Sequence, residues 1–66
     1  SREERIARAL EVIEANGLIT LSDYAYINNL SRTAASLELK EITADRTSPI
    51  GSMGRGSHKV WVKRKE

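Results

Sequence analysis

Hydroxyl groups and cations recur in two parts of this sequence, in a pattern suited to binding a polyanion. In the first part they fall within about ten residues: Ser31, Arg32, Thr33, Ser36 and Lys40. In the second part a glycine-flanked cation precedes another hydroxyl and another cation: Gly54, Arg55, Gly56, Ser57 and Lys59. Serine, threonine, lysine and arginine side chains contact phosphate oxygens and base edges. We therefore predict that the hydroxyls and cations of both parts bind nucleic acid.

The charge of the chain is uneven along its length. The net charge is +2. Residues 1–45 hold five Lys or Arg and eight Asp or Glu, which gives a charge of −3. Residues 46–66 hold six Lys or Arg and one Asp or Glu, which gives a charge of +5. A basic C-terminal third on a mildly acidic body favours contact with a polyanion. The alternative is a solvated charged tail, because Lys63, Arg64 and Lys65 stand at the end of the chain.

The first element that must position these side chains is a helix. Ile6, Leu10 and Ile13 share one face of a 3.6-residue period, which predicts a helix over about residues 2–15. Gly17 suits the left-handed conformation that commonly ends a helix, so we expect the helix to stop there.

Two further helices are expected to follow, separated by a tight turn. Thr20 suits the cap of a helix over about residues 21–28, Asn29 suits a left-handed turn, and Ser31 suits the cap of a third helix that runs to about Ile42. The inward face of the third helix is predicted from its apolar spacing: Ala35, Leu39 and Ile42. Residues 31–40 then place their polar side chains outward.

The end of the sequence has the pattern of a β-hairpin over about residues 49–63. We expect its turn at residues 52–56 and its second strand at residues 58–62, with a further short strand at residues 18–19. The order helix, strand, helix, helix, strand, strand predicts an α+β fold with a three-helix core and a C-terminal hairpin. At 66 residues the chain forms one domain (residues 1–66) with a small core.

Three stretches resemble parts of bacterial winged helix-turn-helix domains: residues 19–25 the second helix, residues 30–42 the recognition helix, and residues 54–57 the wing. In particular they resemble the C-terminal winged domains of RecG-like predicted transcriptional regulators and of Fic-type proteins, over about residues 16–63. The resemblance implies the recognition module of a transcriptional regulator that binds double-stranded DNA. Its third helix would enter the major groove and its basic wing would contact the backbone.

Leu37 departs from this pattern, because such helices usually carry an arginine there. We expect Leu37 at the edge of the core; contact with a thymine methyl group or with a protein partner is the alternative. A winged domain used for protein contact or dimerisation is accordingly the second hypothesis for function. Among the aromatic residues, we expect Trp61 to cover the core, Tyr24 to lie in it and Tyr26 to lie on the surface.

The sequence gives little support to other classes of function. His58 is the only histidine and there is no cysteine, so we expect no metal site, no cofactor, no small-molecule substrate and no catalytic activity. No apolar run approaches the roughly 20 residues of a membrane span. Lack of cysteine fits a reducing compartment, and we expect a cytoplasmic protein. The chain does not begin with Met, so we expect a part of a longer protein; a homodimer stays open.

Overall fold

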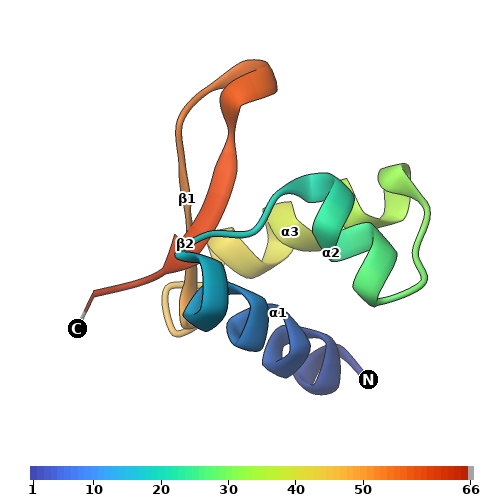
Figure 1. Ribbon diagram of the computed structural model, residues 1–66, viewed down its shortest axis with the longest axis horizontal. Helices are drawn as coiled ribbons and strands as arrows, with labels where there is room; N and C mark the ends of the chain where they lie inside the picture. Colours follow the sequence, from blue (N-terminus) through green and yellow to red (C-terminus); the bar gives the residue numbers. More distant parts are fainter. Residues whose placement is uncertain (66) are drawn as a thin grey trace.

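The computed structural model describes residues 1–65, in which three helices precede a two-stranded antiparallel hairpin (Figure 1). The helices are α1 (Arg2–Asn16), α2 (Leu21–Ile27) and α3 (Arg32–Ala44). The strands are β1 (Ile50–Met53) and β2 (Val60–Lys63), joined through the short 3₁₀ turn η1 (Gly56–His58). This small α+β domain has the three helices and the C-terminal hairpin that the sequence predicts, but no strand in the described residues between α1 and α2. No helix in residues 1–65 has the length and apolar character needed to cross a membrane.

Side-chain caps fix the helix ends, as the residue types predict. The Ser1 hydroxyl accepts a hydrogen bond from the Glu4 backbone, and the Glu4 carboxylate accepts one from the chain terminus. Thr20 and Asp23 form the same reciprocal box at the start of α2. Gly17 ends α1 in the left-handed conformation, with φ at 87°. Each cap satisfies backbone groups that a helix end leaves unpaired.

The turn between α2 and α3 is short and depends on one left-handed residue. Asn29 has φ at 54°, the conformation expected for it. Ser31 then caps α3 through its hydroxyl, which accepts from the Ala34 backbone. The predicted end of α3 is two residues too early, because Thr43 continues the helix and its hydroxyl donates to the Leu39 carbonyl.

The core lies where the three helices meet the base of the hairpin. Its buried apolar residues are Ala9, Ile13, Ile19, Tyr24, Ala25, Ala35, Leu39, Ile42, Ile50 and Trp61. The predicted inward face of α3 is thus confirmed, as are the burial of Tyr24 and Trp61 and the exposure of Tyr26. On α1 the most buried side chain is Ala9, whereas Ile6 and Leu10 are only partly covered.

One buried carboxylate joins the helices. Glu38, on α3, is 8 % exposed and accepts two hydrogen bonds of 2.7 Å from the Arg5 guanidinium on α1. The Tyr24 hydroxyl on α2 donates to the same carboxylate, and Arg2 lies 3.5 Å from it. The hydrogen bonds from Arg5, followed by the one from Tyr24, lower the pKa of Glu38 from 4.5 to about 2. Burial and the contact with Glu38 raise the pKa of Tyr24.

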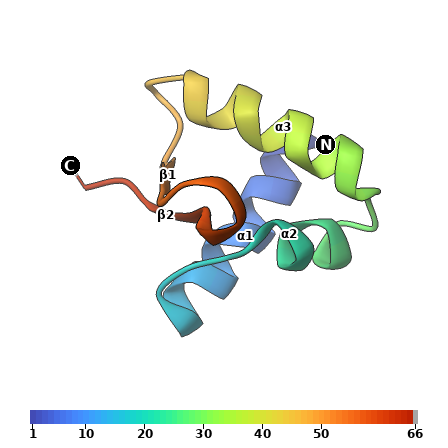
Figure 2. The same cartoon turned by 90° about the horizontal axis from the view of Figure 1, so that it is seen from above.

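An isolated β-bridge ties the hairpin to the segment between α1 and α2. Ile19 and Trp61 exchange two backbone hydrogen bonds of 2.9 Å, so the strand predicted at residues 18–19 is reduced to one residue. Within the hairpin, Ile50 pairs with Lys63 and Met53 pairs with Val60. Figure 1 shows the hairpin rising from the helices, and Figure 2 shows α3 running along one side of it.

The predicted position of the hairpin turn is wrong by a few residues. Ser52 and Met53 belong to β1, and residues 54–59 form the connection. The predicted strand residues His58 and Lys59 therefore precede β2. The physical cause is η1, which inserts a helical turn after Gly54 and delays the return strand.

The buried face of α3 can be tested with two leucines of that helix. Leu39→Ala should lower the free energy of unfolding by about 2–5 kcal/mol, because Leu39 is fully buried and its truncation leaves a cavity. Leu37→Ala is the matched control, since Leu37 is 59 % exposed, and it should change stability by less than about 0.5 kcal/mol. Urea denaturation followed by circular dichroism measures both. Equal losses in the two variants would contradict this orientation of α3.

The buried carboxylate should make stability depend on acidity. Because the pKa of Glu38 is lowered in the folded state, its contribution is complete above pH 4.5 and is lost as the pH falls towards 2. Glu38→Gln should lower the free energy of unfolding at neutral pH by about 1–3 kcal/mol and flatten its decline below pH 4.5. Glu41→Gln, which removes a half-exposed carboxylate paired with Arg2, is the control and should cost less than about 1 kcal/mol. An unchanged acid profile in Glu38→Gln would refute this role.

Candidate nucleic-acid interface

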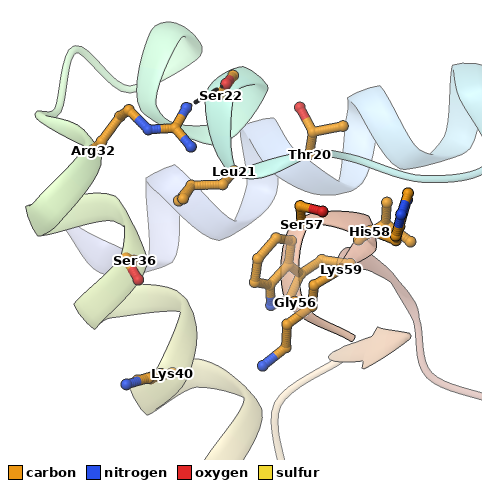
Figure 3. Close-up of a pocket in the computed structure, with 12 residues that line it drawn as sticks. Thr20, Leu21, Ser22, Arg32, Ser36, Lys40, Gly56, Ser57, His58 and Lys59 are labelled. Atoms are coloured by element: carbon orange, nitrogen blue, oxygen red, sulfur yellow. Dashed lines mark hydrogen bonds between the residues drawn. The ribbon is translucent and has the colours of Figure 1, made fainter. Parts of the chain in front are cut away.

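A cavity of about 650 Å³ lies between α3, the start of α2 and the hairpin (Figure 3). Residues 20–22 form one wall, and residues 56–61 of the hairpin form another. Arg32, Ser36 and Lys40 line it from α3, where their spacing of four residues places them one turn apart on the same face. The fold thus brings together side chains from segments up to 41 positions apart in the sequence.

The cavity is positively charged. Its lining contains the cations Arg32, Lys40 and Lys59, and it contains no carboxylate among residues 1–65. None of these three cations forms an ion pair within that part of the chain, in contrast to Arg2 and Arg5 on α1. Like charges that face a common hollow concentrate a positive potential there, which attracts anions.

Arg32 is held in place by a partner that the sequence analysis missed. Its guanidinium donates a 2.6 Å hydrogen bond to the Ser22 hydroxyl, which joins the first turns of α3 and α2 (Figure 3). No sequence pattern signals this contact, because it crosses between two helices. The bond orients Arg32 and leaves its remaining N–H groups for a ligand.

Five of the eight predicted site residues line this cavity: Arg32, Ser36, Lys40, Ser57 and Lys59. The other three lie outside it. Thr33 lines a shallower neighbouring hollow on α3, the Ser31 hydroxyl serves as a helix cap, and Arg55 is exposed at the end of the hairpin. The structure therefore separates a central group of predicted residues from three peripheral ones.

Leu37 is not at the edge of the core, contrary to expectation. Its side chain is 59 % exposed and lines the shallower hollow together with Thr33. Each helical residue turns by about 100°, so a residue two positions before the buried Leu39 points roughly away from the core. Its exposure is compatible with the alternative expectation for Leu37, which is contact with a thymine methyl group or with a protein partner.

Gly54 is needed for the hairpin itself. It has φ at 85°, and a Cβ atom there would lie 2.6 Å from the His58 carbonyl oxygen. Gly56 also has a positive φ, at 56°, but the space around it is open. The two glycines hold Arg55 in an exposed position, where a cation can approach a ligand surface.

Trp61 serves both the core and the cavity. The side chain is 6 % exposed, yet it forms part of the cavity wall, and Lys59 Nζ lies 5.9 Å from the centre of its ring. This distance permits a cation–π interaction. The indole Nε1 is buried and has no hydrogen-bond partner among residues 1–65, although buried tryptophans usually find one.

Comparison with known proteins identifies no relative: no protein-family model, no curated protein and no solved structure matches this chain. What the cavity can bind follows from its own side chains. Its lining offers three cations without ion-pair partners, the hydroxyls of three serines and one threonine, and a tryptophan with an unpaired N–H, all within residues 1–65. A hollow that offers positive charge and hydrogen-bond donors is suited to binding an extended anion.

Proposed function

We propose that this chain is a winged helix-turn-helix domain that binds double-stranded DNA, as the recognition module of a transcriptional regulator and without catalytic activity of its own. In this proposal α2 and α3 form the helix-turn-helix and the hairpin is the wing. The element order supports it, as does the short turn at Asn29. The observation that carries the proposal is the cavity between α3 and the hairpin, lined by three cations and, within residues 1–65, by no carboxylate.

α3 has the chemistry of a recognition helix. Arg32, Ser36 and Lys40 share one outward face and can enter a single major groove, which is wide enough for an α-helix. Arginine can bond to two acceptors of guanine, and serine can bond to several bases. Because Ser22 already orients Arg32, the guanidinium is prepared for such contacts.

The hairpin has the chemistry of a backbone-binding wing. Arg55 is exposed between two glycines, and Ser57 and Lys59 face the cavity. A cation on such a loop is too loosely positioned for bidentate reading of a base. It suits a phosphate or the minor groove instead.

Use of the same fold for protein contact or dimerisation is the second candidate. Leu37 on α3 and Tyr26 on α2 favour it, because their side chains are 59 % and 87 % exposed. Both groups are apolar or aromatic, and such residues are common at the centre of protein interfaces. The absence of a carboxylate from the cavity lining in residues 1–65 favours DNA over this alternative.

Binding to duplex DNA should be detectable and should weaken with salt. Each neutralised phosphate contributes a slope of about −0.9 to the logarithm of affinity against the logarithm of salt concentration. With three cavity cations and Arg55 in contact, we expect a slope of roughly −3 to −4. Fluorescence anisotropy with a labelled duplex of random sequence, titrated at several salt concentrations, measures it. If no association occurred even at low salt, the protein-contact hypothesis would replace this one.

α3 should discriminate between sequences, whereas the wing should not. On a preferred duplex, Arg32→Ala should lose about 1–3 kcal/mol of discrimination at one base pair. Arg55→Ala should weaken binding to preferred and scrambled duplexes equally and reduce the salt slope by about one. Affinities of both variants for both duplexes decide this. If Arg55→Ala abolished discrimination and Arg32→Ala preserved it, the roles of α3 and the wing would be reversed.

A further inference from the structure

The indole Nε1 of Trp61 is a buried donor without an acceptor. It has no partner in residues 1–65, and the residue is 6 % exposed while lining the charged cavity. Most buried side-chain donors are satisfied, so an unpaired one on a residue that lines a hollow points to a ligand that supplies the acceptor. Tryptophan can only donate, so that ligand must present a lone pair.

We propose that Trp61 Nε1 donates a hydrogen bond to an oxygen of one backbone phosphate of the bound duplex, held between Lys59 on the hairpin and Lys40 on α3. This assignment rests on the DNA-binding function proposed above and deepens it. Lys59 now lies over the indole ring, with Nζ 5.9 Å from the ring centre. In the complex, the flexible side chain of Lys59 turns towards the phosphate, and the phosphate oxygen then reaches Trp61 Nε1.

Phosphate fits this position better than a neutral acceptor. Arg32, Lys40 and Lys59 line the same cavity, which has no carboxylate among residues 1–65. A carbonyl group would satisfy the indole N–H but carries no charge, whereas a phosphodiester satisfies the N–H and also brings a negative charge that these cations attract. The hydroxyl of Ser57, in the same wall, offers a further donor.

A phosphate bound here would fix the register of the domain on DNA. Trp61 is held by two backbone hydrogen bonds to Ile19 and by burial in the core, so its N–H has a set position relative to the helices. Phosphate contacts carry no sequence information directly, but they determine which base edges a recognition helix meets. Trp61 is therefore a positioning contact for α3.

The test uses the indole N–H signal of the chain's one tryptophan. In a nitrogen–proton correlation spectrum this signal should move downfield when a duplex is added. The shift should follow the same binding curve, with the same dissociation constant, as the anisotropy titration. Methylphosphonate, which is neutral, is then placed at each backbone position in turn. One position should abolish the downfield shift and lower affinity by about tenfold. A saturated complex in which the indole signal stays in place would overturn the inference and leave DNA binding intact.

Two lysine variants separate the local contact from general electrostatics. Lys59→Gln and Lys65→Gln remove the same charge, but only Lys59 lines the cavity. Lys59→Gln should lower affinity by about tenfold and reduce the downfield shift, whereas Lys65→Gln should lower affinity by about twofold and preserve it. Equal effects of the two variants on affinity and on the shift would overturn the inference.

Inorganic phosphate distinguishes this inference from the proposed function. If no duplex bound at low salt, the DNA proposal would fail. A titration with inorganic phosphate would then test the anion site at Trp61 independently of DNA binding. A saturable downfield shift of the indole signal with inorganic phosphate would support an oxyanion site at Trp61, and an unmoved signal would overturn it.

Discussion

The buried carboxylate of Glu38 fixes how the three helices face one another. It receives hydrogen bonds from Arg5 on α1 and Tyr24 on α2 while belonging to α3. These hydrogen bonds form only when the three helices hold a particular orientation. A carboxylate buried away from water must keep its partners, because the loss of one partner leaves an unpaired charge. Rotation of α3 would break these bonds. The same constraint that turns Glu38 inward therefore turns Arg32 and Lys40 outward, where they line the cavity.

The position of the hairpin depends on two further contacts. The Ile19–Trp61 bridge joins it to the segment before α2. Arg64 donates hydrogen bonds to the carbonyl oxygens of Thr43, Asp45 and Ser48, and so pairs backbone acceptors at and beyond the end of α3. Arg64 is thus a structural residue, although it stands in a segment whose composition suggests a solvated tail. With β2 held at Trp61 and just beyond its end at Arg64, one wall of the cavity is fixed against α3.

Several polar groups at this cavity lack a partner in the part of the chain that the structure describes. Arg32, Lys40 and Lys59 face one hollow without ion-pair partners within residues 1–65, and Trp61 leaves an N–H unpaired there. Arg2 and Arg5 on α1, by contrast, form ion pairs with Glu38 and Glu41 on α3. A small domain has a narrow margin of stability, so such features are expected where a ligand compensates them. This contrast supports the cavity as the functional surface.

The sequence by itself determines where the helices begin and which face of α3 is buried. The caps at Ser1 and Thr20 and the turn at Asn29 depend on residues within three or four positions, and the apolar period of α3 is equally local. Only the tertiary structure decides the Glu38 network and the cavity at Trp61. These depend on atoms far apart in the chain, whose approach is set by packing and not by any local pattern.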